Sequence, residues 1–223
     1  ISRSAQDEFS AESQRRALNA IEKGYFKDQI VPLTVRKGRE EQIFDTDEFP
    51  QNSSVEKLSK LRPAFKKDGM VTPGNASGIN DGASATVVMS ASKAEALGVK
   101  ARLRLVARAE AGVDPSIMGS GPIPAVNKVL EKADMTLEQM DVIELNEAFA
   151  SVACACANEL SLDPEKTNPN GGAIALGHPV GATGNILTVK LMYEMERTGA
   201  RYGLVSMCIG GGQGIATIFE RLS

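Results

Sequence analysis

Short apolar runs alternate with helix-like stretches from about residue 83 to the end of the chain, and this alternation most strongly limits the possible folds. The apolar runs are rich in β-branched residues or alternate apolar with polar residues, as strands do. Strands that alternate with helices indicate α/β layers. We expect strands over 83–89, 103–109, 140–145, 202–208 and 215–219, and helices over 93–97, 122–132, 147–160 and 184–197. The last two strands are joined by glycines, which indicates an antiparallel edge on a mixed sheet.

The first third of the chain is less regular. Phe9, Ala17, Leu18 and Ile21 fall roughly on one stripe and predict a helix that Gly24 ends. Four further segments are expected before the alternating region. They are a strand over 30–35, a charged surface loop over 37–52, a short helix over 54–61 and a Gly/Asn/Ser-rich loop over 71–82.

The composition excludes several classes of partner. The chain has 223 residues, of which 42% are hydrophobic and 24% charged, as in ordinary globular domains. Aromatic residues make up only 4% and Trp is absent, which argues against a stacking surface for single-stranded nucleic acid. A net charge of −3 without a long basic run argues against a phosphate-backbone partner. No apolar stretch approaches membrane-spanning length, so we expect neither a nucleic-acid nor a membrane partner.

The start of the chain and its cysteines suggest a cellular location. The sequence begins Ile1-Ser2-Arg3, without Met and without the apolar core of a signal peptide. We therefore expect it to be the interior of a longer protein. Three cysteines, an odd number, do not suggest the disulfide framework of a secreted domain. We expect a cytoplasmic protein.

Three segments place polar or reactive groups beside sparsely covered backbone. The first is Asn146-Glu147-Ala148-Phe149, where an expected strand ends and a buried helix begins. Ligands of α/β sheets usually bind at the carboxyl ends of strands, which makes Asn146 a candidate functional residue. The alternative is structural, because an Asn at this position can accept a backbone N–H and cap the helix. The residues alone leave both interpretations open.

The second segment contains His178, the only histidine of the chain, within a glycine-rich loop over 177–184. Imidazole titrates near neutrality and can hold or deliver a proton. A lone histidine is more often structural than catalytic. The surrounding glycines favour function here, because they let the backbone approach a ligand closely.

The third segment is Cys208-Ile209-Gly210-Gly211-Gly212-Gln213-Gly214, between the last two expected strands. A thiol at a strand end can act as a base or nucleophile when its thiolate is stabilised. The glycines leave backbone N–H groups free to point at a developing oxyanion. The alternative is a buried, inert cysteine beside a flexible turn, but four glycines in five positions exceed what a tight turn needs.

Other patterns predict no metal or additional cofactor. Cys154 and Cys156 stand two positions apart in an expected helix, so they do not share a face and are interpreted as packing residues. Gly119-Ser120-Gly121-Pro122 resembles a dinucleotide loop only superficially, because proline lacks the N–H donor that such a loop needs.

Taken in order, the three segments resemble the C-terminal signatures of the thiolase family: Asn-Glu-Ala-Phe, Gly-His-Pro-x-Gly-Ala-Thr-Gly and Cys-Ile-Gly-Gly-Gly-Gln-Gly. Residues 74–82 resemble the pantetheine-binding loop of that family, and residues 118–125 resemble a stretch at its acyl pocket. The resemblance covers essentially the whole chain. The glycines after Ile209 are more similar to biosynthetic acetoacetyl-CoA thiolases than to degradative 3-ketoacyl-CoA thiolases.

The resemblance implies an acetyl-CoA C-acetyltransferase, which condenses two acetyl-CoA molecules reversibly into acetoacetyl-CoA and CoA through an acylated cysteine. On this sequence, His178 would activate that cysteine and then hold the thioester oxygen of the second acetyl-CoA. Asn146 would support the same oxyanion site, Cys208 would remove a proton from the second acetyl group, and the Gly210 N–H would donate to the acyl-enzyme oxyanion. CoA thioesters are substrates here, and no cofactor is implied.

The resemblance also implies a substrate tunnel. Ala76 and Ser77 would contact the pantetheine arm of CoA. Four residues would line the apolar part of the tunnel: Phe65, Met118, Ala148 and Phe149.

The implied fold has two similar α/β halves in dimers or tetramers. This chain would supply the C-terminal half, with a five-stranded mixed sheet and helices, and part of the inserted loop domain. Residues 1–73 would hold the end of the N-terminal half and the partial loop domain, and residues 74–223 the C-terminal thiolase domain. The missing N-terminal half, in the same or a separate chain, would be the partner.

Two departures from the family pattern matter. The acylated cysteine lies in the N-terminal half, and neither Cys154 nor Cys156 replaces it, so we expect the chain alone to be inactive. Gln51 stands where many relatives have an Arg that meets the CoA nucleotide, which leaves open how the phosphates are held. Two alternatives remain: a degradative 3-ketoacyl-CoA thiolase, and a non-catalytic CoA-binding subunit.

Overall fold

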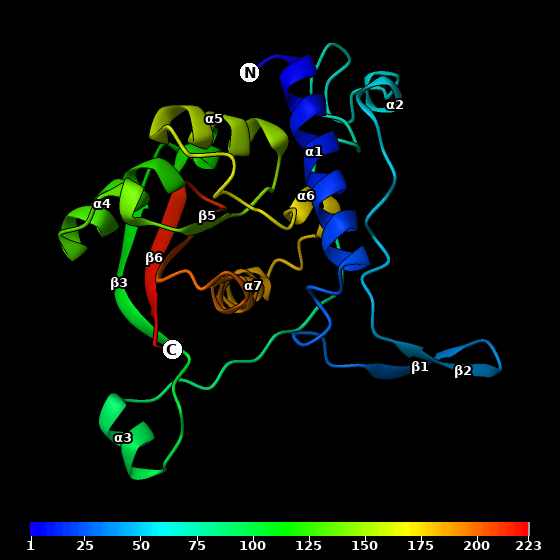
Figure 1. Cartoon of the computed structure of the whole chain (residues 1–223). Helices are drawn as coiled ribbons and strands as arrows, with labels where there is room; N and C mark the ends of the chain where they lie inside the picture. Colours follow the sequence, from blue (N-terminus) through cyan, green and yellow to red (C-terminus); the bar gives the residue numbers. More distant parts are fainter. Residues whose placement is uncertain (223) are drawn as a thin grey trace.

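Two strands near the C-terminus, β5 (Tyr202–Ile209) and β6 (Gln213–Arg221), form an antiparallel hairpin at the centre of a four-stranded sheet. Strand β3 (Leu103–Gly112) runs antiparallel beside β6, and β4 (Val142–Leu145) runs parallel beside β5. The computed structural model describes residues 1–222 (Figure 1). The expected mixed α/β sheet is therefore confirmed. The last two strands were expected at an edge of the sheet but lie at its centre, because β3 pairs with β6, and four regular strands form where five were expected.

A fifth position beside β4 is filled by a single bridge instead of a regular strand. Thr167 pairs with Ile143 in an isolated parallel bridge. The side chain of Asn168 continues the ladder, since its Oδ1 accepts the Leu145 N–H at 2.8 Å and its Nδ2 donates to the Leu145 carbonyl at 2.8 Å. An Asn amide can replace a peptide group in this way because it carries the same donor and acceptor.

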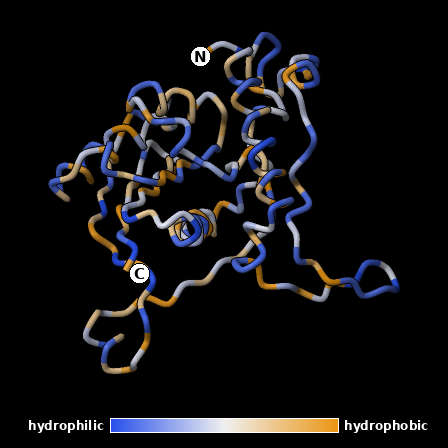
Figure 2. Tube along the Cα trace, viewed as in Figure 1, coloured by the Kyte–Doolittle hydropathy of each residue, from blue (hydrophilic) through white to orange (hydrophobic). Residues whose placement is uncertain are grey.

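The expected buried strand over 83–89 is wrong. No strand forms there among the described residues, and Val87 and Val88 are 86% and 88% exposed. The segment instead runs away from the sheet to the short helix α3 (Ala91–Ala96), as Figures 1 and 2 show. The apolar pattern predicts that the segment is buried, but periodicity does not identify the surface that would cover it.

Helices cover both faces of the sheet and create two apolar clusters. Ile143 and Leu204 face the cluster beneath the helices of one side. Their chain neighbours Val142 and Val205 face the other side, because successive strand residues point to opposite faces. The helices of the first side are α4 (Pro122–Ala133) and α5 (Ala150–Leu160), and that of the second is α7 (Thr183–Thr198). The shorter helical segments nearby are η1 (Pro115–Ser120), η2 (Leu137–Gln139) and α6 (Ala173–Leu176).

The first helix, α1 (Arg3–Glu22), buries a polar face. Phe9, Leu18 and Ile21, expected on the buried stripe, are only partly buried. The residues that the structure buries are Gln6, Asp7, Ser10, Ser13, Gln14, Ala17 and Ala20. Of the expected stripe, Ala17 is buried, but the rest of the buried face is mostly polar, because hydrogen bonds to α6 and to loops hold this helix where apolar contacts were expected.

A hairpin projects from the body of the molecule (Figure 1). It consists of β1 (Leu33–Lys37) and β2 (Glu40–Phe44), and the charged loop expected over 37–52 is wrong for β2. The five residues of β2 read Glu-Glu-Gln-Ile-Phe, without the alternation of apolar and polar residues that would predict a strand, and all five are exposed. The next helix, α2 (Val55–Ser59), begins after Ser54, whose hydroxyl accepts the Lys57 N–H. None of the helices between residues 1 and 222 has the length and apolar character needed to cross a bilayer.

Candidate active site

Asn146 and Cys208 lie at the same carboxyl edge of the sheet. Asn146 comes directly after β4, and Cys208 is near the end of the neighbouring parallel strand β5. Leu145 pairs with Ser206, and the Asn146 N–H donates to the Ser206 carbonyl at 2.9 Å. Asn146 is 1% exposed and Cys208 is 6% exposed. Helix α5 begins only at Ala150, with Phe149 at its N-cap, so the alternative that Asn146 caps this helix is wrong.

His178 lies against Asn146, so the structure brings these two expected site residues together. The His178 Nε2 atom is 3.4 Å from the Asn146 Nδ2 atom. Its other ring nitrogen, Nδ1, is 2.6 Å from the Thr183 hydroxyl. Burial lowers the pKa of His178, which favours a neutral imidazole at neutral pH.

One atom of this pair lacks a partner. The Asn146 Oδ1 atom is buried and accepts no hydrogen bond from residues 1–222. Buried polar atoms in proteins are nearly always satisfied, so an orphaned acceptor beside an imidazole suits a bound water or a polar group of a ligand.

The side chain of Glu147, the residue after Asn146, accepts hydrogen bonds from three separate segments. Its Oε2 accepts the Ser13 hydroxyl at 2.6 Å and the Ile174 N–H at 3.3 Å, and its Oε1 accepts the Asn168 amide at 2.8 Å. Burial raises the pKa of this carboxyl. The sequence alone assigns Glu147 no role, because its partners lie far away in the chain. A Cβ at Gly172 would stand 2.2 Å from the Glu147 Cδ, which shows how closely the backbone covers the carboxyl.

Glu144 of β4 and Lys190 of α7 form a buried ion pair. The Lys190 ammonium is 2.8 Å from a Glu144 oxygen and 2.7 Å from the Gly171 carbonyl. Burial raises the pKa of Glu144 against the opposing influence of Lys190. The pair fixes α7 to β4, which places the loop that carries His178 relative to Asn146. Sequence reasoning missed it, since a Glu in a strand and a Lys in a helix carry no motif.

The loop expected to bind pantetheine runs beside the segment that begins α5. Ala76 and Phe149 form an antiparallel bridge, and the Ser77 N–H donates to the Ala148 carbonyl at 3.0 Å. The rings of Phe65 and Phe149 meet edge to face with centroids 6.5 Å apart. Five of the six residues expected at the substrate are thus brought together.

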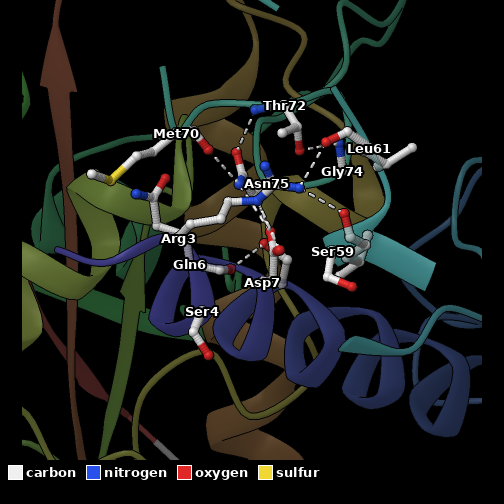
Figure 3. A network of polar contacts seen from close by, with 12 residues as sticks. Arg3, Ser4, Gln6, Asp7, Ser59, Leu61, Met70, Thr72, Gly74 and Asn75 are labelled. Carbon is white, nitrogen blue, oxygen red and sulfur yellow. Dashed lines mark hydrogen bonds and ion pairs between the residues drawn. The ribbon is translucent and has the colours of Figure 1, made fainter. Parts of the chain in front are cut away.

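A polar network holds this loop to α1 (Figure 3). The Asn75 Nδ2 group donates to Asp7 and to the Met70 carbonyl, both at 3.0 Å, and its Oδ1 accepts the Thr72 N–H at 2.8 Å. Arg3 pairs with Asp7 at 2.8 Å. Fully buried Asn75 therefore fixes the backbone immediately before Ala76 and Ser77. Asn75 lies in the stretch that resembles the pantetheine-binding loop, but the sequence alone gave it no role of its own.

The glycine-rich turn after Cys208 packs tightly against the end of η1, which carries Met118, the sixth residue expected at the substrate. A Cβ on Gly214 would stand 2.0 Å from the Gly121 carbonyl oxygen, and one on Gly121 would stand 2.4 Å from the Gln213 carbonyl oxygen. Two residues of the turn, Gly211 and Gly212, have φ near +90°, which side chains disfavour. The tight packing places η1, with half-buried Met118, beside the hairpin of Cys208. Gly210 lies in this turn, and space around its Cα is open.

The thiols differ in their surroundings. Burial raises the pKa of Cys208, so it rests as a thiol. Burial, together with the nearby Cys208, raises the pKa of Cys156 to about 12. Cys156 is fully buried in the apolar cluster under α5, in keeping with a packing role. Within residues 1–222, His, Cys, Asp and Glu side chains form no group that could hold a metal.

Residues 99–221 match the family described as "Thiolase, C-terminal domain", and residues 1–92 match "Thiolase, N-terminal domain". The junction between these matches lies between residues 92 and 99.

The most similar proteins include thiolases of several kinds. The chain is 56% identical to the beta-ketothiolase BktB of Cupriavidus necator, over all of this chain and 57% of that protein. A crystal structure of the Bacillus anthracis acetyl-CoA acetyltransferase superposes with a TM-score of 0.95 at 49% identity, covering all of this chain and 57% of that one. A crystal structure of human mitochondrial 3-ketoacyl-CoA thiolase gives 0.94 at 42% identity, covering 100% and 56%. The chain thus spans a little over half the length of these relatives, and it belongs to the thiolase family.

Proposed function

We propose that this chain forms the C-terminal part of a biosynthetic acetyl-CoA C-acetyltransferase, an acyltransferase that condenses two acetyl-CoA molecules into acetoacetyl-CoA and CoA. The observation that carries the proposal is the pairing of His178 with Asn146 at the strand edge that also bears Cys208. A neutral imidazole beside an orphaned amide oxygen suits proton transfer and oxyanion binding in one place. Relatives named acetyl-CoA acetyltransferase support the acetyl specificity.

The first half-reaction acetylates a cysteine that lies outside this chain. His178 takes the proton of that thiol as its sulfur attacks the carbonyl of acetyl-CoA. The Gly210 N–H, in the open turn after Cys208, donates to the oxyanion that develops. CoA then leaves as a thiolate and takes the proton of Cys208. Burial raises the pKa of Cys208, so its proton is present for this transfer.

The second half-reaction joins the two acetyl groups. The Cys208 thiolate removes a proton from the methyl group of the second acetyl-CoA, whose thioester oxygen is held by protonated His178 and by a group bound to Asn146. The carbanion attacks the acyl-cysteine, a C–C bond forms, and the cysteine leaves as a thiolate. That thiolate recovers its proton from His178, so both thiols end as they began.

The substrate tunnel follows the contacts around Phe149. Ala76 and Ser77 lie alongside Phe149 and Ala148, in a position to contact the pantetheine arm. Phe65, which is 74% exposed, extends the apolar wall. Met118 closes the tunnel beside the Cys208 hairpin in this proposal. The Gln51 backbone N–H donates to the Gln14 side-chain oxygen at 2.7 Å, which holds this residue beside α1.

The partner in this proposal is an N-terminal thiolase half, in the same or a separate chain, which supplies the acylated cysteine. The exposed valines of the segment over 83–89 support it, because this segment matches the N-terminal family description. A homo-oligomer, dimer or tetramer, and a cytoplasmic location complete the proposal. Three free cysteines are compatible with a reducing compartment.

The test is an assay of the protein assembled with its N-terminal half, with acetyl-CoA as the only substrate. Formation of acetoacetyl-CoA and free CoA in equal amounts supports the proposal. CoA binding without any acyl-enzyme would instead support the alternative of a non-catalytic CoA-binding subunit.

The degradative 3-ketoacyl-CoA thiolase remains a second candidate, favoured by the likeness to the human mitochondrial 3-ketoacyl-CoA thiolase. A profile of thiolysis rates against acyl chain length separates the two. A sharp maximum at acetoacetyl-CoA supports the biosynthetic enzyme, whereas rates that rise with chain length would contradict it.

A further inference from the structure

Thr183 presents one hydroxyl proton to two neighbours. Its Oγ1 atom is 2.9 Å from the Pro179 carbonyl oxygen and 2.6 Å from the His178 Nδ1 atom. A carbonyl oxygen can only accept, so the contact with Pro179 uses the hydroxyl proton. The contact with His178 must then use the hydroxyl lone pair and a proton on Nδ1.

The opposite ring nitrogen indicates the same arrangement. The atom that faces His178 Nε2 at 3.4 Å is the amide nitrogen of Asn146, which can only donate. Nε2 is therefore the acceptor of the ring. Two independent neighbours, one at each nitrogen, specify a single tautomer.

We propose that Thr183 is a positioning residue that holds His178 in the tautomer protonated at Nδ1 and leaves the Nε2 lone pair to accept the nucleophile's proton. The second part of this inference rests on the proposed function. Burial favours the neutral ring, so the tautomer decides which nitrogen can act as a base. The Thr183 side chain is itself rigid, because it is 3% exposed and begins helix α7.

Spectroscopy reads the tautomer directly, without any assay of activity. In the full-length protein labelled with [15N]histidine, the His178 signals are assigned by their loss in His178→Gln. Protonated and unprotonated ring nitrogens have well-separated 15N shifts. We expect Nδ1 protonated in the wild type, a mixture of tautomers in Thr183→Val and recovery of the single tautomer in Thr183→Ser. A wild type protonated at Nε2, or a Thr183→Val protein with an unchanged tautomer, would overturn the inference.

Helix α7 offers a matched control. The Thr188 hydroxyl donates to the Gly184 carbonyl at 2.9 Å, the same bond to the residue four positions earlier, and within the described residues it makes no hydrogen bond to the imidazole. Thr188→Val therefore removes an equivalent helix hydroxyl and should leave the His178 spectrum unchanged.

Kinetics of the assembled enzyme test the consequence. We expect Thr183→Val to lower kcat for acetylation by about tenfold or more with KM nearly unchanged, because a wrongly protonated imidazole is a poor base in a bound complex. Thr183→Ser should restore the rate. An equal loss in Thr188→Val would show that the effect is a general one on the helix and would contradict the inference. If the wild type forms no acyl-enzyme but the spectra behave as expected, the proposed function fails and the role of Thr183 stands.

Discussion

The hydroxyl of Ser13 and the carboxylate of Glu147 meet at 2.6 Å although 134 residues separate them in the chain. Every hydrogen-bonding neighbour of Glu147 donates to it. In either orientation, the amide of Glu147→Gln turns its NH2 group toward a donor that cannot accept, the Asn168 NH2 group or the Ile174 N–H. We expect this variant to lose about 1–3 kcal/mol of unfolding free energy, measured by denaturant titration.

Glu12 supplies the control for that change. It pairs with Arg15 and Arg16 at the surface, where its side chain is 41% exposed. Glu12→Gln should cost less than about 1 kcal/mol, because exposed ion pairs contribute little. Equal losses in the two variants would contradict a special role for the buried carboxyl.

His178 should make stability depend on pH in one direction. Burial lowers its pKa in the folded state below the usual value of 6.5, while the unfolded chain keeps that value. Below about pH 6.5 the unfolded state therefore binds more protons, and folding loses stability as the pH falls. Unfolding free energies of the wild type, measured against His178→Gln, should decline over this range. A difference that stays constant or grows toward acid pH would contradict the buried neutral imidazole.

The contact between Gly214 and Gly121 should not tolerate a methyl group. A Cβ on Gly214 would stand 2.0 Å from backbone, which cannot yield as a side-chain end can. We expect Gly214→Ala to destabilise the protein by about 1–3 kcal/mol or more and to displace the Cys208 hairpin. Gly181→Ala is the control, since a Cβ there meets nothing within 4 Å, and thermal melting should change little. Matching melting temperatures in both variants would refute the packing argument.

Asn75 should affect CoA binding through the loop it supports. Replacing it with Ala removes the acceptor of the Thr72 N–H and the donor to the Met70 carbonyl, and it frees the backbone before Ala76. We expect weaker CoA binding in calorimetric titration of the assembled enzyme. Asn52→Ala, a change at an exposed position, should bind as the wild type does. Unaltered CoA affinity in Asn75→Ala would show that the hydrogen bonds of Asn75 do not support the binding loop.

Local patterns predicted the elements that the structure forms around the sheet, and tertiary context decided the rest. The hairpin of β5 and β6 follows from strand alternation interrupted by glycines. The segment over 83–89 carries the same kind of pattern, yet Val87 and Val88 remain exposed, because pattern alone does not identify the partner sheet. Helix α1 shows the reverse case, in which buried polar residues such as Ser13 find partners that lie far away in sequence.

The residues of the candidate site likewise fall into those that the sequence predicted and those that only the fold revealed. Its reactive groups, His178 and Cys208, stand in motifs that sequence reading finds. The groups that hold them, among them Glu147, Asn75 and Thr183, depend on contacts across the fold. All three stand inside segments that the family resemblance covers, but the role of each consists of its neighbours and is visible only in the fold.

The measurement that tests the account most directly is peptide-mapping mass spectrometry of the assembled enzyme after incubation with acetyl-CoA, combined with an assay for acetoacetyl-CoA. We predict for Cys208→Ala an acetyl group on a cysteine outside this chain and no acetoacetyl-CoA. This separation would assign the acyl carrier to the N-terminal half and the condensing base to Cys208. Condensation that persists in Cys208→Ala, or an acetyl group on Cys154 or Cys156, would contradict it.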